Sequence, residues 1–272
     1  MIEELFSIGS LSISPFGVML VLALLTSYWQ LKRGLIAGKI GDEEDASAIV
    51  FACGVAGILG GKLYYAILVG DPMMMLDRAG IVWYGSLIGG AAAFIWSVRN
   101  RGLPLAATFD AASTALPLGY AVGRVGCFLV GDDYGVPTDL PWGVAFENGL
   151  PPTTAGILRR EFGVDVPAEI ADSTVLAVHP TQLYTVFASL LIFAFALRLR
   201  RRVRWRPGNF FAVVLMIMSV ERIMVEFLRA KDDRFFGVFT LAQLISVLII
   251  LLLGFILWRR GLRAPSKAGA SP

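Results

Sequence analysis

Long apolar runs constrain this chain more than any other feature of its sequence. The runs cover roughly residues 13–31, 47–69, 81–98, 105–130, 180–197, 209–228 and 239–258. Folded as a helix, each run can cross about 30 Å of hydrocarbon while its backbone groups bond to one another. Hydrophobic residues make up 56% of the chain and charged residues 17%, a balance that excludes an ordinary soluble domain. The sequence therefore predicts an all-α, polytopic membrane protein of about seven transmembrane helices.

The segments that connect the runs alternate in basic content. One set holds the basic residues Lys32, Arg33, Lys39, Arg99, Arg101, Arg198, Arg200, Arg201, Arg202, Arg204, Arg206, Arg259, Arg260, Arg263 and Lys267. Because basic segments stay in the cytoplasm, we expect the N-terminus outside and the C-terminus inside. A removable signal peptide is the alternative for the first run. Glu3 and Glu4 make its start acidic and no small-residue cleavage site follows, so we expect a membrane span instead.

The long connection 131–178 faces outward in this orientation. It carries eight acidic residues against Arg159 and Arg160, together with five prolines. Prolines limit regular structure but allow an ordered loop, and the segment is too short for a large domain. We expect a small cap that belongs to a single transmembrane domain over residues 1–262, followed by a polar tail over 263–272.

Several glycines inside the runs are spaced by four residues, which places both members of a pair on one helix face. The pairs are Gly57 with Gly61, Gly85 with Gly89, and Gly119 with Gly123. Small residues at this spacing let two membrane helices approach closely. Tight helix packing explains these glycines, and no strand–turn–helix context indicates a nucleotide-binding loop.

Charged side chains inside the runs are the informative exceptions, because an ion at the centre of a bilayer costs at least about 2.5–3.5 kcal/mol. The most informative are Arg124 late in the fourth run, and Glu221, Arg222, Glu226 and Arg229 late in the sixth. Lys62, in the second run, is expected to reach toward water or to pair with another residue. At 100° per residue, Arg222, Glu226 and Arg229 fall within about 60° of one another. Glu226 can therefore neutralise either arginine, whereas Glu221 points about a quarter turn away and needs another partner.

Two interpretations of these charges remain open at this point. The first is a structural network of salt bridges between helices, with arginines that reach toward water. The second is an anion site in which Arg124 and Arg222 bind a phosphate group bidentately. The glycines that flank Arg124 open space around its charge, which favours the second interpretation for that residue.

His179 is the only histidine of the chain and stands just before Pro180, at the start of the fifth run. Pro180 suits the first helical turn, so His179 is expected at or near the helix cap, as a structural residue or as a general base. One histidine without a matching cysteine or carboxylate spacing does not predict a metal site. Cys53 and Cys127 do not indicate a disulfide framework.

Four stretches together resemble the signatures of the prolipoprotein diacylglyceryl transferase family. They are Gly123-Arg-Val-Gly-Cys-Phe128 followed by Tyr134-Gly135, His179-Pro-Thr-Gln-Leu-Tyr184, Arg222-Ile-Met-Val-Glu-Phe-Leu-Arg229, and Tyr84-Gly-Ser-Leu-Ile-Gly-Gly90. The match runs in order from residue 15 to 230. The chain has Tyr84, Cys127, Asp132 and Phe16 where the better-known members have histidine, asparagine, glutamate and tyrosine.

The resemblance implies a reaction, partners and a site. The family transfers a diacylglyceryl group from phosphatidylglycerol to the lipobox cysteine of a prolipoprotein signal peptide, in the cytoplasmic (inner) membrane of bacteria, without a cofactor or nucleic acid. Catalytic roles are implied for Arg124, Arg222, Tyr84, Glu226 and His179. Contacts with substrates are implied for Phe16, Gly85, Gly123, Gly126, Cys127, Asp132, Gly135, Gln182, Tyr184 and Arg229.

Two other functions stay open on the sequence. One is a transporter that carries phospholipids or other anions on the same arginines, although no internal repeat indicates it. The other is an inactive homologue that binds lipid, for which the residues Tyr84 and Cys127 are the main argument.

Overall fold

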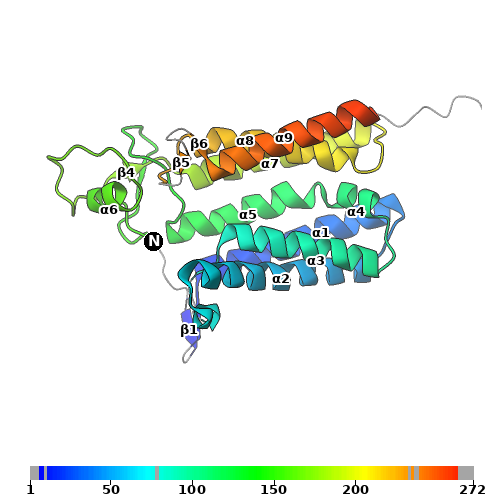
Figure 1. The fold of residues 1–272 in the computed structure, drawn as a ribbon, viewed down its shortest axis with the longest axis horizontal. Helices are drawn as coiled ribbons and strands as arrows, with labels where there is room; N and C mark the ends of the chain where they lie inside the picture. The colour runs from blue at the N-terminus through cyan, green and yellow to red at the C-terminus, as the bar shows by residue number, and fades with distance from the viewer. Residues whose placement is uncertain (1–5, 9–10, 77–79, 232–233, 236–238, 263–272) are drawn as a thin grey trace, which may run out of the picture. The chain divides into compact units, whose positions relative to one another are not determined.

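The computed structural model describes residues 6–8, 11–76, 80–231, 234–235 and 239–262. The predicted tail over 263–272, with Arg263 and Lys267, lies outside the described residues. Every predicted apolar run is helical (Figure 1). The long helices are α1 (Pro15–Gly38), α2 (Glu43–Val69), α3 (Trp83–Asn100), α4 (Leu105–Ala112), α5 (Ala115–Val130), α7 (Thr181–Arg202), α8 (Asn209–Glu226) and α9 (Leu241–Arg260).

The remaining elements are short. They are the 3₁₀ helix η1 (Pro72–Leu76), the helix α6 (Ala155–Arg160), and three two-stranded antiparallel pairs: β1 (Phe6–Ile8) with β2 (Leu11–Ile13), β3 (Val144–Ala145) with β4 (Ala177–Val178), and β5 (Arg234–Phe235) with β6 (Phe239–Thr240). The described chain is therefore mostly helical.

Among the described residues, three helices are long and apolar enough by themselves to cross a membrane: α2, α7 and α9. The bent pair of α4 and α5 gives a fourth when the two are taken as one span. The fold class of a helical membrane protein agrees with the prediction at this level.

The fourth run is broken, although the sequence predicts one helix over 105–130. Helices α4 and α5 meet at an angle of 43° around Ser113 and Thr114. Pro117 has no N–H to bond the carbonyl of Ser113, four residues earlier, and its ring would clash with that carbonyl in a continuous helix, so the break falls there. The Ser113 hydroxyl also bonds back to the carbonyl of Phe109, 3.1 Å away. The apolar run continues through the break, so hydropathy alone could not place it.

The chain divides into two compact units, and each is described here by itself. Unit 2 spans residues 24–115 and is built on α2 and α3, which pack along their length. A Cβ atom added to Gly60 would lie 2.4 Å from the Gly85 carbonyl oxygen, and one added to Gly89 would lie 2.2 Å from that of Ala56. The predicted close approach of helices through glycine is confirmed at Gly61, Gly85 and Gly89.

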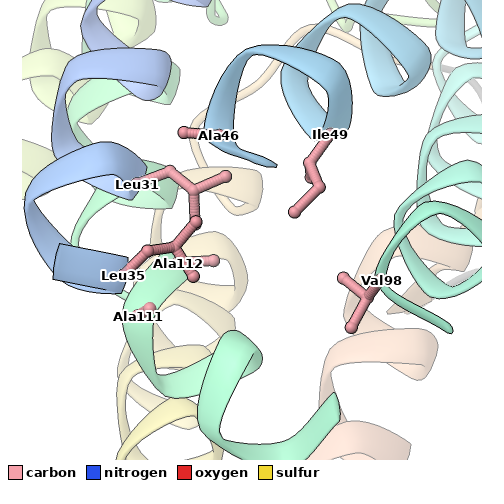
Figure 2. Close-up of a cluster of buried hydrophobic side chains, with 7 residues drawn as sticks. All are labelled: Leu31, Leu35, Ala46, Ile49, Val98, Ala111 and Ala112. Atoms are coloured by element: carbon pink, nitrogen blue, oxygen red, sulfur yellow. The ribbon is translucent and has the colours of Figure 1, made fainter. Parts of the chain in front are cut away.

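The core of unit 2 gathers at one end of these helices. Figure 2 shows its buried side chains: Leu31, Leu35, Ala46, Ile49, Val98, Ala111 and Ala112. Beside this core, Arg101 pairs with Glu44 and Asp45 at the start of α2. Asp42 caps α2 through a reciprocal capping box with Asp45, which satisfies two backbone N–H groups at the helix start.

Unit 1 contains residues 1–23 and 116–272. In it α8 packs between α7 and α9, and a small core of Ile192, Ala196, Phe210 and Val214 joins α7 to α8.

The connection 131–178 folds into a compact cap around the paired strands β3 and β4. Its own apolar core contains Tyr134, Phe146, Ala155, Leu158, Val166, Val178 and Ala230. The cap therefore holds an ordered structure despite its prolines.

Candidate active site

A tight turn at the C-terminal end of α5 begins the site. The amide of Gly131 donates to the carbonyl of Cys127, 2.9 Å away, and Gly131 adopts a φ of 72°, which suits glycine at a helix end. Asp133 also has a positive φ, 57°, a conformation that aspartate tolerates better than most residues. This turn directs the Asp133 carboxylate at two arginines.

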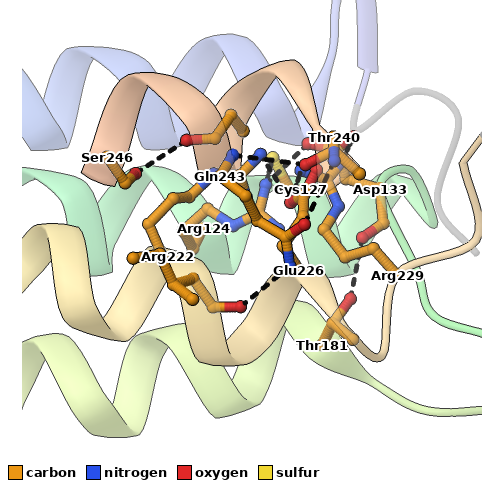
Figure 3. Close-up of polar contacts among 12 residues, drawn as sticks. Arg124, Cys127, Asp133, Thr181, Arg222, Glu226, Arg229, Thr240, Gln243 and Ser246 are labelled. Carbon is orange, nitrogen blue, oxygen red and sulfur yellow. Dashed lines mark hydrogen bonds and ion pairs between the residues drawn. The ribbon is translucent and has the colours of Figure 1, made fainter. Parts of the chain in front are cut away.

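Asp133 joins Arg124 of α5 to Arg229, which follows α8 (Figure 3). Arg124 Nη1 donates to Asp133 Oδ2 at 2.7 Å, and Arg229 Nη2 donates to Asp133 Oδ1. Both arginines are almost fully buried, at 6% and 5% exposure. Although the surrounding protein favours the neutral acid, Arg229 and Arg124 hold the pKa of Asp133 well below its usual range.

Glu226 forms the second half of this network on α8. Its Oε2 lies 2.8 Å from Arg222 Nη2 and 3.6 Å from Arg229 Nη1. Glu226 therefore pairs with Arg222, four residues before it, and with Arg229, three residues after it, which confirms the predicted pairing with both arginines. Glu221 turns away from these residues and finds a hydrogen bond with Thr185 of α7.

Arg124 keeps hydrogen-bonding capacity that this network does not use. Its Nε and Nη2 atoms are buried and have no hydrogen-bond partner among the residues that the structure describes. A buried donor without a partner is costly, and two adjacent guanidinium N–H groups match the oxygens of a phosphate or carboxylate. A Cβ atom added to Gly123 would meet nothing within 4 Å, so no other element packs closely against the helix face at Gly123. Gly123 thus departs from the predicted role in tight helix packing.

Cys127 and Asp132 lie against the same arginine. Cys127 Sγ is 3.5 Å from Arg124 Nη1, and its thiol hydrogen-bonds to Asp132. Asp132 Oδ1 is buried without a hydrogen-bond partner in the described part of the chain. Burial, and then the nearby Asp133 charge, raise the pKa of Asp132 to about 6. Asp132 can therefore exchange a proton near neutral pH.

Cys127, Asp132 and Asp133 could be considered as a metal site, since one ligand atom from each lies within 4.8 Å of the others. Asp133 is already occupied by two guanidinium groups, which repel a cation. The two guanidinium groups therefore argue against a metal ion at these three residues.

The start of α7 fixes the turn from the other side. Thr181 Oγ1 donates to the backbone carbonyl of Asp133 at 2.9 Å, and Gln182 Nε2 donates to that of Asp132. The amide of Gly135 donates to the carbonyl of His179 at 2.9 Å. A Cβ atom on Gly135 would lie 2.4 Å from the Leu228 carbonyl oxygen and 2.7 Å from His179 Cβ. Gly135 therefore lets the cap, α7 and the end of α8 meet.

His179 precedes the helix cap, which is Pro180, and its side chain takes part in a separate chain of contacts. His179 Nδ1 lies 3.1 Å from the Tyr184 hydroxyl, which accepts a hydrogen bond from Trp142 Nε1 at 2.8 Å. Partial burial lowers the pKa of His179, so the imidazole is neutral at pH 7 and able to accept a proton.

Phe16 and Gly126 lie together in unit 1. A Cβ atom added to Gly126 would lie 3.3 Å from the Phe16 ring, so α1 begins against α5 at the residue next to Cys127. Tyr84 and Gly85 lie in unit 2, where the Tyr84 ring packs edge-on against Trp83 and Gly85 contacts α2. All the predicted site residues except Tyr84 and Gly85 thus lie in unit 1.

Two residues of this site were missed by the sequence reasoning. Asp133 links both arginines, yet only its neighbour Asp132 matched a motif position. The available sequence signal was Gly131, which precedes this acidic pair. A glycine in a left-handed conformation after a helix can turn the side chains that follow back toward that helix. Trp142 carried no such signal, since its role depends on the fold of the cap.

Comparison with known proteins agrees with these motifs. The model of the family described as prolipoprotein diacylglyceryl transferase matches residues 3–259. A phosphatidylglycerol–prolipoprotein diacylglyceryl transferase of Wolbachia pipientis subsp. Culex pipiens is 31% identical over 91% of this chain and 90% of its own. One from Clostridium tetani is 31% identical over 91% of this chain and 93% of its own. One from Corynebacterium efficiens is 26% identical over 99% of this chain and 84% of its own.

Proposed function

We propose a mechanism from the premise that this chain belongs to the prolipoprotein diacylglyceryl transferase family, a family of membrane enzymes. The chain transfers a diacylglyceryl group from phosphatidylglycerol to a prolipoprotein, as the names of its relatives indicate. The acceptor that we propose is the thiol of the lipobox cysteine. Glycerol phosphate is the second product. The observation that carries the mechanism is Arg124, buried beside Asp133 with two donor atoms that no described residue uses.

The reaction is a displacement at a carbon atom. The lipobox thiolate forms a sulfur–carbon bond with the carbon of the diacylglyceryl group that is attached to the phosphate. The bond between this carbon and the phosphate oxygen breaks. The electron pair leaves with the phosphate oxygen, so negative charge grows on the leaving group. Donors fixed in advance around that charge lower the barrier. Such a displacement needs no metal or organic cofactor.

Arg124 and Arg222 are proposed to bind the phosphate. Arg124 offers Nε and Nη2, while Glu226 and Asp133 hold the arginines in place and limit the net charge of the site. Arg222 is the more accessible of the pair, with a side chain 20% exposed. A planar guanidinium can match two phosphate oxygens at once, which a lysine cannot do.

A base must take the proton of the substrate thiol, because the thiolate is the nucleophile. We assign this role to Asp132, whose Oδ1 atom is buried without a partner in the described residues and whose pKa of about 6 suits proton exchange. The proton can then pass to the glycerol phosphate that leaves. His179 is the alternative base, and Tyr184 holds its imidazole in place. The family motif also assigns Tyr84 and Gly85 to the site, and a Tyr84→Phe variant tests whether that hydroxyl is used.

The proposed arrangement in the membrane has seven spans, formed by α1, α2, α3, the pair α4 and α5, α7, α8 and α9. Basic residues in the last turns of α7 and α9 support a cytoplasmic position for these ends, with the N-terminus outside. Residues 1–262 then form one membrane domain, and the cap over 131–178 faces outward. In a bacterial inner membrane, this is the face where exported signal peptides and outer-leaflet lipids arrive.

The proposed function is tested with the purified protein, phosphatidylglycerol micelles and a lipobox peptide. We expect the peptide to gain one diacylglyceryl group while an equal amount of glycerol phosphate is released. A peptide with serine in place of the lipobox cysteine is the control and gains nothing. Binding of phosphatidylglycerol without any transfer, in a protein that is folded by its thermal transition, would instead indicate an inactive homologue.

A further inference from the structure

The ends of α7 and α9 in unit 1 carry a dense group of arginines. Six of the nine residues over 198–206 are arginines, and two more end α9. The side chain of Asn209, at the start of α8, donates to the backbone carbonyls of Gly261 at 2.8 Å and Leu262 at 3.2 Å. The end of α9 therefore lies beside the connection from α7 to α8 (Figure 1), and the two groups of arginines share one end of the unit.

Six of these arginines are exposed, and their side chains have no ion-pair partner in the part of the chain that the structure describes. We call them the basic surface of unit 1: Arg198, Arg201, Arg202, Arg204, Arg259 and Arg260. The reason lies in the sequence, which has no acidic residue between Asp172 and Glu221 and none after Asp233. The positive charge of this surface is therefore not balanced by the segments that form it.

Two basic residues of unit 2 show the contrasting arrangement, because the acidic start of α2 neutralises them. Lys32 pairs with Glu43, and Arg101 pairs with Glu44 and Asp45. The helix that starts beside the basic surface of unit 1, α8, has no acidic residue in its first turn. The helix dipoles favour basic residues in the last turns of α7 and α9, but they leave the charges on this one surface to repel one another. Anions from outside the chain relieve this repulsion when they bind.

The surface of α9 next to these arginines is apolar, which limits the kind of partner. This helix is apolar enough to cross a membrane, and it exposes Leu248, Leu251, Leu252, Phe255 and Trp258. Trp258 is 76% exposed and comes directly before the two arginines that end the helix. Tryptophan is enriched at the level of lipid headgroups, where its ring has an apolar and a polar side. A partner that contacts both the arginines and this helix face is therefore amphipathic, with an anionic head and an apolar tail.

We propose that the basic surface of unit 1 binds the headgroups of anionic phospholipids, with their acyl chains along α9. Clusters of about 4–8 basic residues next to a membrane span attract such lipids, and a guanidinium group matches two phosphate oxygens. The 22 residues of α7 cover about 33 Å between this surface and Thr181, which bonds to the Asp133 turn. The surface is therefore separate from the candidate active site, and the inference does not depend on the proposed reaction.

The inference is tested by native mass spectrometry, which counts the lipids retained by each protein molecule in a neutral detergent. The probes are phosphatidylserine, which is anionic, and phosphatidylcholine, which has no net charge. We expect the unsubstituted protein to retain phosphatidylserine preferentially. The triple variant Arg201→Gln/Arg202→Gln/Arg204→Gln should bind at least one of these lipids about tenfold or more weakly, since each arginine near an anionic headgroup contributes on the order of fivefold in affinity. Lysine at the same three positions keeps the charge and should retain most of the binding.

The matched control is Arg33→Gln/Lys39→Gln/Arg99→Gln, which removes three exposed positive charges from unit 2 and should change phosphatidylserine binding less than about twofold. A thermal transition verifies that each variant is folded. Unchanged retention of phosphatidylserine in the folded glutamine variant of unit 1 would overturn the inference. Equal losses in the two triple variants would also overturn it, because binding would then follow the net charge of the chain. Glycerophosphoserine, the same headgroup without acyl chains, should bind far more weakly, and equal binding would rule out a lipid as the partner.

Discussion

Asp133 accepts a hydrogen bond from Arg229, which lies 96 residues further along the chain. The same carboxylate accepts from Arg124, nine residues before it. One side chain thus holds the end of α5 to the end of α8 at the point where the cap begins. Asp133 is thus the ion-pair partner of Arg124 and shares Arg229 with Glu226.

Replacement of Asp133 by asparagine should therefore weaken both the fold and the activity. We expect a loss of about 1–3 kcal/mol in unfolding free energy, because buried arginines lose a charged partner while Asp133 itself is 42% exposed. We also expect lipid transfer to fall at least about tenfold as Arg124 shifts. Thermal unfolding and transfer rates measure the two effects. Asp139→Asn, an exposed acid of the same cap, is the control, and equal losses in both variants would contradict the role of Asp133.

Asp132 should set the pH dependence of transfer. With a pKa of about 6, its carboxylate is available as a base only above that pH, so kcat/KM should rise with pH and level off above about 6. Asp132→Asn should lower the rate and remove this rise, leaving the ionisation of the substrate thiol near pH 8.5. A profile that keeps its rise near pH 6 in Asp132→Asn would assign the base to another residue, with His179→Gln as the next variant.

The same carboxyl group should also make stability depend on pH. Because its pKa is raised from 3.8 to about 6 on folding, the folded chain binds the proton more tightly than the unfolded chain. Its contribution to stability is complete below pH 3.8 and is lost as pH rises through about 6. The melting temperature of Asp132→Asn relative to the unsubstituted protein should therefore increase between pH 4 and pH 7. A constant difference across that range would mean that Asp132 has an ordinary pKa.

Gly135 and Gly123 provide a matched pair of glycine substitutions. Alanine at Gly135 would place Cβ 2.4 Å from the Leu228 carbonyl oxygen, and the backbone there cannot give way easily. We expect Gly135→Ala to destabilise the protein by about 1–3 kcal/mol or more. Alanine at Gly123, which has nothing within 4 Å, should leave the melting temperature unchanged or raise it. A smaller loss for Gly135→Ala than for Gly123→Ala would show that the cap does not meet α8 as described.

Two neighbouring arginines of α6 should differ in their effect on the cap. Arg159 donates to three backbone carbonyls of the following loop and to Asp172, whereas Arg160 is bonded to Asp172 alone. Arg159→Ala should therefore release the loop and speed its cleavage in limited proteolysis. Arg160→Ala removes an ion pair that is exposed to solvent and therefore contributes little, so it should leave the cleavage rate nearly unchanged. Similar rates for the two variants would contradict this difference.

The sequence predicted most of the helices because hydropathy and helical period are local properties. The pairing of Glu226 with Arg222 and Arg229 was predictable for the same reason, since a helix places residues three and four apart on one face. The break between α4 and α5 was not predicted from hydropathy, because the apolar run continues through it. The local signal was Pro117, which cannot bond the carbonyl of Ser113 and clashes with it in a continuous helix.

The centre of the site was harder to predict, because it depends on contacts between distant segments. Asp133 meets Arg229 only after the cap, α7 and α8 have folded, and no local pattern encodes that approach. The contact between Trp142 and Tyr184 has the same origin. Local patterns found the charged residues of each helix, and only the tertiary structure determined which of them share a partner.

The central claim is that Arg124 and Arg222 stabilise the phosphate that leaves. Its most direct test is the rate of diacylglyceryl transfer to a lipobox peptide by the Arg124→Gln/Arg222→Gln double variant, with folding verified by its thermal transition. Removal of single donors to a developing negative charge commonly costs a factor of about 10²–10³ in rate. We therefore predict a loss of at least about a thousandfold. A folded double variant that transfers lipid within about tenfold of the unsubstituted rate would contradict the account.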